Sequence, residues 1–311
     1  MRTAVIGAGY LGRFHAQKYA RLPNSTLIGV ADPNEAARNA VAAESGVAAY
    51  ADYRDLLGRV DAVSVVTPTP THQEIAAAFL DAGAHVLVEK PMTVTVAEGE
   101  SLIAAAKRAG RIVQVGHLER FNAAMRALAP ILAVPRFIES ARLAPFKNRG
   151  TDVDVVLDLM IHDIDLILSI VRSPVVSVDA IGTSVFSGEV DIANARLRFA
   201  NGCVANATAS RVSLKTERKL RLFQDDSYVS VDLQQKVLTV IRKGAGQGAD
   251  GMPQVAIDET TYEQGDALRD EIEAFLAAAA AGTPPAVSGE DGLLALRTAI
   301  AITDQVARTG R

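Results

Sequence analysis

Apolar and polar residues follow two different patterns along this chain. Up to about residue 117, short apolar runs alternate with longer amphipathic segments, which is typical of βαβ units around a parallel sheet. Gly83 and Gly110 follow two of the amphipathic segments, where a helix C-terminus favours a residue with positive φ. The pattern predicts strands at residues 3–6, 26–31, 47–50, 62–67, 84–89 and 111–116. We therefore expect an N-terminal α/β domain with a parallel sheet over residues 1–118.

A second pattern follows residue 118 and indicates an α+β domain over residues 119–311. Alternating apolar and polar positions flank Asn201-Gly202, a two-residue hairpin turn, and a glycine-rich loop is expected at residues 244–251. The expected strands are residues 136–143, 195–199, 204–208, 219–224, 228–231 and 237–242, and the expected helices are residues 123–133, 155–171, 267–281 and 289–308. These elements predict a large, mostly antiparallel open sheet with helices on one face.

Composition narrows the class of protein. The 311 residues carry a net charge of −4, so no basic field is present to bind nucleic acid. Cys203 is the single cysteine, and we expect it to be a small buried residue without a disulfide. Apolar stretches fall short of the roughly 18 residues of a membrane span, and the first strand starts too early to leave room for a leader. We therefore expect a cytoplasmic protein with no membrane partner.

Residues 7–12 read Gly-Ala-Gly-Tyr-Leu-Gly, between the first predicted strand and the first helix. In this setting Gly7 permits a tight turn, Gly9 lets backbone amides approach a pyrophosphate, and Gly12 allows close packing of helix on strand. Asp32 ends the second strand, where a carboxylate accepts the ribose hydroxyls of NAD and repels the 2′-phosphate of NADP. The alternative is a turn with incidental glycines. We expect a Rossmann domain that binds NAD.

Two further segments end strands at the carboxyl edge of the parallel sheet, where such sheets bind ligands. Thr67 and Pro68 begin a rigid turn, and His72 then either faces the cofactor or has a capping or solvent-exposed position. Glu89 and Lys90 end the fifth strand. Lys90 is either a surface lysine or a catalytic residue beside the nicotinamide, with a pKa lowered by burial and by the cationic ring. The residues expected to contact the cofactor are Gly7, Gly9, Tyr10, Leu11, Gly12, Asp32, Thr67, Pro68, His72, Glu89 and Lys90.

The helix predicted at residues 155–171 is almost wholly apolar except for one polar stripe. With about 100° per residue, Asp158, His162 and Asp165 lie within about 60° of one another. A buried helix with such a stripe lines a cleft, in which Asp158 orients His162 and His162 takes a hydroxyl proton. The alternative is a buried structural pair. His117 and His162 lack the ligand cluster of a metal site, so no metal is expected.

Residues 117–122 lie where the first domain leads into the second, which favours a position in the wall of a cleft. The residues expected to contact the substrate are Lys90, His117, Arg120, Asn122, Asp158, His162 and Arg211. Cations also occur in predicted loops and strand ends of the second domain, at Arg142, Lys147, Arg149, Arg211, Lys215 and Arg218. They are either scattered surface charges or a set that binds a diphosphate.

Together these motifs resemble the glucose-fructose oxidoreductase/inositol dehydrogenase (Gfo/Idh/MocA) family along the whole chain. The resemblance rests on the glycine loop, the Thr-Pro turn, Glu-Lys-Pro, Gly-His at 116–117 and the Asp-xxx-His helix. It implies an NAD(P)-dependent sugar or polyol oxidoreductase in which Lys90, Asp158 and His162 are catalytic. It also implies a homodimer or homotetramer formed through the open face of the C-terminal sheet. The glycine pair usual before the catalytic aspartate is replaced by Asp-Val-Val-Leu at 154–157, which leaves the start of that helix open.

Within the family, residues 116–122, 158–165 and 209–213 are similar to bacterial members that oxidise the 3-hydroxyl of UDP-N-acetylglucosamine and so supply the 3-amino sugar of lipid A. This similarity implies a nucleotide-sugar substrate, with His162 as the general base and Lys90 stabilising the alkoxide. The alternatives are a dehydrogenase of a free sugar or of a polyol such as inositol, and an NAD-binding regulatory protein. A regulator would have no use for Lys90, Asp158 and His162 together.

Overall fold

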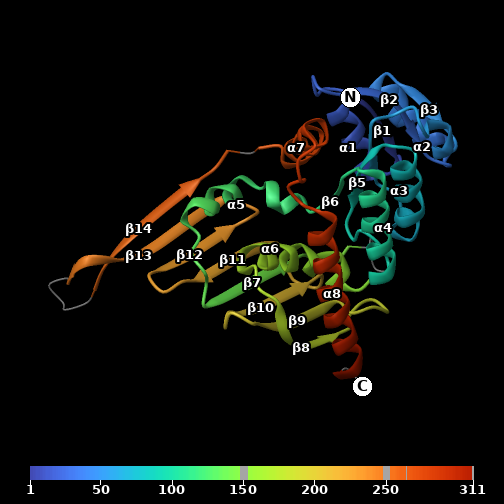
Figure 1. Ribbon diagram of the computed structural model, residues 1–311. Helices are drawn as coiled ribbons and strands as arrows, with labels where there is room; N and C mark the ends of the chain where they lie inside the picture. The colour runs from blue at the N-terminus through green and yellow to red at the C-terminus, as the bar shows by residue number, and fades with distance from the viewer. Residues whose placement is uncertain (148–152, 248–252, 264, 310–311) are drawn as a thin grey trace. The chain divides into compact units, whose positions relative to one another are not determined.

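The computed structural model describes residues 1–147, 153–247, 253–263 and 265–309 (Figure 1). The chain forms two compact units. Unit 1 consists of Met1–Leu118 and Asp266–Leu296, and unit 2 consists of Glu119–Gly265 and Arg297–Arg311. The expected boundary after residue 118 coincides with one division, whereas Asp266–Leu296 belongs with the N-terminal unit.

Unit 1 is built on a six-stranded parallel sheet with the strand order β3-β2-β1-β4-β5-β6. The strands are β1 (Arg2–Ile6), β2 (Thr26–Ala31), β3 (Ala48–Tyr50), β4 (Ala62–Val65), β5 (His85–Glu89) and β6 (Val113–Gly116). The prediction of these strands and of a Rossmann sheet is confirmed. From β1 the strands are added toward one edge as β2 and β3, and from β4 they are added toward the other edge. Dinucleotides bind at the carboxyl ends of the strands beside such a switch point, here between β1 and β4.

Some helices of unit 1 begin and end at caps that the sequence supplies. The helices of this unit are α1 (Tyr10–Tyr19), α2 (Glu35–Ser45), α3 (His72–Asp81), α4 (Val96–Ala109), α7 (Ala267–Ala281) and the first part of α8 (Gly289–Thr309), with 3-10 helices at Tyr53–Leu56 and Thr69–Thr71. Thr95 and Glu98 form a capping box at the start of α4, which Gly110 ends with φ 60°. Gly83 also has the predicted positive φ, at 88°.

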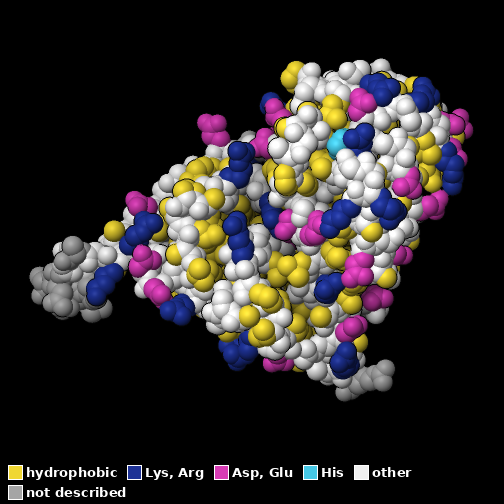
Figure 2. All heavy atoms as spheres, in the orientation of Figure 1, with side chains coloured by type: hydrophobic (Ala, Val, Ile, Leu, Met, Phe, Trp, Pro, Cys, Tyr) yellow, Lys and Arg dark blue, Asp and Glu magenta, His cyan; other side chains and the backbone are white. Residues whose placement is uncertain are grey.

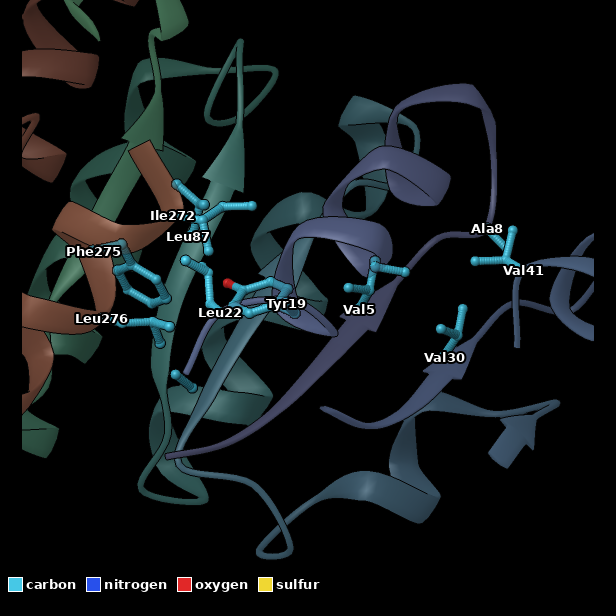
Figure 3. Packing of buried hydrophobic residues seen from close by; sticks show 12 residues of the cluster. Val5, Ala8, Tyr19, Leu22, Val30, Val41, Leu87, Ile272, Phe275 and Leu276 are labelled. Carbon is cyan, nitrogen blue, oxygen red and sulfur yellow. The ribbon is translucent and has the colours of Figure 1, made fainter. Parts of the chain in front are cut away.

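A hydrophobic core joins the parallel sheet to helices α1 and α7 (Figure 3). Tyr19 and Phe275 are fully buried there, together with Val5, Leu87 and Ile272. Burying one side chain of this kind stabilises the fold by roughly 1.5 to 3 kcal/mol. This packing explains why α7 belongs to unit 1 although it follows the second sheet in the sequence.

Unit 2 contains an eight-stranded sheet with the strand order β14-β13-β12-β11-β7-β10-β9-β8. The strands are β7 (Phe137–Leu143), β8 (Val175–Thr183), β9 (Ile192–Phe199), β10 (Val204–Ser210), β11 (Glu217–Phe223), β12 (Ser227–Asp232), β13 (Val237–Gln247) and β14 (Pro253–Thr261). Only the pair of β7 and β10 is parallel among these described strands. The predicted hairpin turn joins β9 to β10, with Gly202 at φ 88°. The mostly antiparallel sheet is therefore confirmed.

Two strands of this sheet, β8 and β14, were not predicted. They lie at the two edges, and their side chains remain largely exposed, as Ile181 and Ile257 show with 63% and 60% exposure. Because neither face of these strands is extensively buried, their sequences need no regular apolar alternation. The segment expected as a glycine-rich loop is strand as far as Gln247, and residues 248–251 of it lie outside the described residues.

Helices α5 (Ala123–Leu128) and α6 (Ile161–Val171) pack on the sheet of unit 2, α5 against β12 and β13 and α6 against β7 and β10 (Figure 1). 3-10 helices occupy Leu118–Phe121 and Ala129–Ile131, and a π-helix occupies Val156–Met160. The helix predicted at 123–133 ends early because Pro130 has no amide hydrogen to continue it. Among the helices of the described chain, none is both long and apolar enough to cross a bilayer.

Candidate active site

The glycine loop between β1 and α1 adopts a shape that side chains would block. Gly7 has φ 99°, and a Cβ there would lie 2.4 Å from the carbonyl oxygen of Val66. A Cβ on Gly12 would lie 1.8 Å from the carbonyl oxygen of Gly7, so the loop and the helix are in direct contact. A Cβ on Gly9 would meet no atom within 4 Å. Gly9 therefore presents an open backbone surface to a ligand.

The amino terminus of α1 is suited to the pyrophosphate of a dinucleotide. Gly9 is the N-cap, and no side chain caps the helix or places an acidic group in its first turn. A hollow of about 440 Å³ between α1 and α2 is lined by Gly9 and Tyr10 and by the ion pair of Arg13 and Glu44, and Tyr10 is 65% exposed. Because the first amides and the helix dipole favour an anion, these residues fit NAD and would hold its pyrophosphate.

Asp32 lies just beyond the end of β2, next to the glycine loop. Its carboxylate accepts hydrogen bonds from the amides of Ala8 at 2.7 Å and Asn34 at 2.8 Å. Arg38 donates to the carbonyl oxygens of Asp32 and Pro33 at 3.4 and 3.0 Å. The carboxylate is thus fixed by two backbone amides at the edge of the sheet where a ribose would bind.

His72 connects the Thr-Pro turn with the Glu-Lys-Pro segment, and both belong to unit 1. Its Nδ1 lies 3.0 Å from the carbonyl oxygen of Pro91, and its Nε2 lies 2.8 Å from that of Thr67. Burial lowers the pKa of His72, although the backbone contacts with Thr67 and Pro91 act in the opposite direction. The side chain is 1% exposed, so the expected solvent-exposed position is wrong, and Thr71 rather than His72 is the N-cap of α3. His72 instead holds the Thr-Pro turn beside the segment that carries Lys90.

A buried polar chain stands behind Lys90. The carboxylate of Glu89 lies 3.1 Å from Nε2 of His15 and accepts from the amide of Lys90 at 3.3 Å. Nδ1 of His15 lies 3.1 Å from Oγ of Ser64, which lies 2.8 Å from the hydroxyl of Tyr19. Burial raises the pKa of Glu89, but the hydrogen bond and charge of His15 and the charge of Lys90 bring it below its ordinary value. His15 carries no motif, so only the structure identifies it as the residue that orients Glu89.

Asp158 and His162 come from the π-helix and the first turn of α6. Oδ1 of Asp154 accepts from the amides of Val156 and Leu157 at 2.7 and 2.9 Å, which starts the segment. The segment predicted as an α-helix begins as a π-helix. This wider turn occupies residues 156–160, next to the position where the family that the motifs resemble usually has a pair of glycines. Asp158 and His162 are both half-buried. Short π-helical turns are frequent at functional sites.

Two other acidic residues of α6 form ion pairs within unit 2. Asp165 accepts from Arg120 through both oxygens, at 2.8 and 2.6 Å. Asp163 accepts from Arg142 at 3.0 and 2.9 Å, and Arg142 also donates to Glu119 at 2.9 Å. Burial alone would lower the pKa of Arg142, but the carboxylates of Asp163 and Glu119 raise it above its ordinary value. Arg142 is therefore a buried structural residue, neither the surface charge nor the diphosphate ligand expected from the sequence.

Two residues expected to bind substrate are engaged inside unit 2. Arg211 is 5% exposed, lies 3.7 Å from the carboxylate of Asp191 and donates to the carbonyl oxygen of Val153. Asn122 is the N-cap of α5 and donates to the carbonyl oxygen of Leu233 at 2.8 Å. Both side chains thus have structural contacts that account for their burial.

The remaining predicted residues are more scattered. His117 is buried at the end of β6, and Lys147 is exposed. Lys215 lies within ion-pair distance of Glu217, and Arg218 lies within ion-pair distance of Glu119. Arg149 lies outside the described residues. On the face drawn in Figure 2, acidic and basic side chains are interspersed. Within the described ranges, no group of three side chains is arranged to hold a metal ion.

Comparison with known proteins identifies the family of this chain. Residues 1–117 match the oxidoreductase family with an NAD-binding Rossmann fold, and residues 103–229 match the GFO/IDH/MocA C-terminal domain. The UDP-N-acetylglucosamine 3-dehydrogenase of Acidithiobacillus ferrooxidans is 42% identical over 97% of this chain and 96% of its own length. A solved structure of that enzyme has a TM-score of 0.94 and covers 99% of this chain and 98% of the other. The myo-inositol 2-dehydrogenase of Thermotoga maritima is 28% identical over 95% of this chain and 93% of its own length.

These matches define the class first: the protein is an NAD-binding oxidoreductase with a Rossmann domain. More particularly, the chain belongs to the Gfo/Idh/MocA family, as its motifs indicated. The expectation of a dehydrogenase is thereby confirmed.

Proposed function

We propose that this protein is an NAD-dependent dehydrogenase that oxidises the 3-hydroxyl of UDP-N-acetylglucosamine to a ketone. The observation that carries the proposal is the similarity along nearly the whole chain. The relative with that activity in its name is 42% identical, whereas the inositol dehydrogenase of Thermotoga maritima is 28% identical. The half-buried pair Asp158 and His162 supplies an acid–base group of the kind the reaction needs.

Oxidation of a secondary alcohol removes a proton from oxygen and a hydride from carbon. In this proposal His162 takes the hydroxyl proton on an imidazole nitrogen, and Asp158 orients the ring and stabilises its protonated form. The ammonium group of Lys90 stabilises the negative charge that develops on the oxygen. NAD, when bound, accepts the hydride.

The remaining residues hold the cofactor and the substrate. The amides at Gly9 bind the pyrophosphate of NAD, and the carboxylate of Asp32 binds the adenosine ribose. Thr67 and Pro68 contribute the turn at the edge of the sheet, and His72 keeps that turn and the Lys90 segment in register.

The proposal is tested by NADH absorbance at saturating NAD with UDP-N-acetylglucosamine, N-acetylglucosamine, other UDP-sugars and myo-inositol. We expect the highest kcat/KM with UDP-N-acetylglucosamine. Reduction of the product with borodeuteride should place deuterium at C3 of the sugar. Turnover of inositol or a free hexose in the absence of turnover of UDP-sugars would overturn the proposal in favour of a polyol or sugar dehydrogenase.

We further propose that the protein acts in the cytoplasm as a homodimer or homotetramer and that its product supplies the 3-amino sugar of lipid A. The extended sheet of unit 2 supports an oligomer, because apolar side chains such as Ile181 and Ile257 are exposed on its edge strands. Light scattering of the full chain should give a mass of two or four subunits. A monomer at micromolar concentration would contradict this part of the proposal.

A further inference from the structure

A pocket opens between α5 and α6 on the sheet of unit 2, and no part of the mechanism above uses it. Its volume is about 420 Å³, within the range of small-molecule sites. Three arginines line it, Arg120, Arg126 and Arg172, beside apolar residues that include the partly exposed Met125 and Leu132. Among the described residues that line this α5–α6 pocket, none is acidic. The pocket therefore suits an anion with an apolar portion.

Arg172 has a backbone conformation that an arginine rarely adopts. It ends α6 with φ 48° and ψ 42°, in the left-handed region where helix C-termini favour glycine. Its Nε donates to the carbonyl oxygen of Ser169 at 3.1 Å, which directs the guanidinium along the last turn of the helix. Glycine would fit this backbone with less strain. The arginine caps a carbonyl of the last turn through Ser169 and also lines the pocket.

The α5–α6 pocket continues the stripe of α6 that begins with the proposed base. Leu166, Ser169 and Arg172 line the pocket and follow His162 by four, seven and ten positions, the spacing of one helix face. With 1.5 Å of rise per residue, Ser169 stands roughly 10 Å along the axis from His162. The diphosphate is attached to C1, which is separated from C3 by one ring carbon. A sugar with C3 at His162 can therefore extend its diphosphate along this stripe of α6.

Arg120 connects the pocket to that stripe. Its guanidinium is held by both carboxylate oxygens of Asp165, one residue before Leu166, and its side chain is 18% exposed. An arginine fixed in this way is preorganised, so little side-chain freedom is lost when it contacts a phosphate. Arg211, by contrast, is almost fully buried beside Asp191, with a side chain that is 6% exposed.

We propose that the α5–α6 pocket binds the nucleoside diphosphate portion of the substrate, with Arg126 and Arg172 on the phosphates and its apolar residues against the base. This inference rests on the proposed function for its substrate. Guanidinium groups bind phosphate oxygens in a bidentate manner and stack on planar rings, and both properties match a nucleotide. The proposal moves the recognition of the diphosphate from Arg211 to Arg126 and Arg172.

The test uses Arg172→Gly in the full-length protein, because glycine fits the left-handed backbone and removes only the side chain. We expect KM for UDP-N-acetylglucosamine to rise about tenfold or more and kcat to change less than threefold. The dissociation constant of UDP alone, measured by calorimetry, should rise by a similar factor. Arg126→Ala should act in the same direction. Arg198→Ala, which removes an exposed cation from β9, is the matched control and should change neither quantity.

The possible outcomes separate this inference from the proposed function. Turnover of UDP-N-acetylglucosamine with an unchanged KM in Arg172→Gly and Arg126→Ala would overturn the pocket while leaving the proposed function intact. If the wild type turns over no UDP-sugar, UDP binding that weakens in Arg172→Gly still supports the pocket. Absence of UDP binding to the wild type, or equal weakening in Arg198→Ala, would overturn it.

Discussion

The buried chain behind Lys90 makes a sharp prediction about stability. His15 is 0% exposed and connects the carboxylate of Glu89 to the hydroxyl of Ser64. Replacing it by leucine keeps an apolar side chain of similar size but removes both polar contacts. A hydrogen bond to a charged group contributes roughly 1.5 to 3 kcal/mol and a neutral one roughly 0.5 to 1.5 kcal/mol. His15→Leu should therefore destabilise unit 1 by about 2 to 4 kcal/mol at pH 7.

The loss of unfolding free energy in His15→Leu should depend on pH, and the pKa of Glu89 determines the direction of this dependence. The folded pKa of Glu89 lies below its ordinary value, so its carboxylate stabilises the wild type above the unfolded pKa of about 4.3 and this contribution is lost as pH falls through the folded value. In His15→Leu the lowering influence of His15 is gone and burial remains, which raises the pKa of Glu89. The difference in unfolding free energy between the two proteins should thus be largest at pH 7 and should shrink below about pH 4.

Hydrogen exchange of peptides from β1, β4 and α1 measures unit 1 by itself, which matters because two units need not unfold together. Tyr19→Phe is the control, since it removes only the outer hydroxyl of the chain, 2.8 Å from Ser64, and should cost about 1 kcal/mol. A loss below 1 kcal/mol in His15→Leu, or the same loss at pH 7 and pH 4, would refute the role given to the His15–Glu89 contact.

Three further predictions concern the cofactor and the chemistry. Lys90→Met and His162→Ala should each lower turnover by roughly 10² to 10⁴-fold and leave NAD binding within a few-fold; near-native turnover in either variant would remove that residue from the mechanism. Gly12→Ala should prevent stable folding of unit 1, because its Cβ would lie 1.8 Å from a carbonyl oxygen, whereas Gly9→Ala should keep the thermal transition and weaken NAD binding, as calorimetry can measure. Asp32→Asn should lower the NAD-over-NADP preference by roughly tenfold or more in paired titrations, and an unchanged ratio would show that the carboxylate does not face the 2′-phosphate.

The sequence by itself determined the parallel sheet, the glycine loop and the hairpin at Gly202. Each depends on neighbouring residues: strand and helix periods differ, and positive φ at Gly7 and Gly202 is readily adopted only by glycine. The same local reasoning identified the apolar helix that carries Asp158 and His162. It could not specify that the helix starts as a π-turn, because that turn depends on where Asp154 places its carboxylate.

Only the tertiary structure decided what each cation does. The sequence does not distinguish the roles of Arg142, Arg172 and Arg211. In the structure, Arg142 and Arg211 are buried beside aspartates, whereas Arg172 lines a pocket. The pairing of Arg142 with Asp163 joins residues 21 positions apart on a strand and a helix, so it depends on how α6 packs on β7. In the same way, α7 joins the first unit because Phe275 packs in a core that contains Leu87, which lies more than 180 positions earlier in the sequence. Burial and long-range contact are properties of the folded chain, and a local pattern of residues does not contain them.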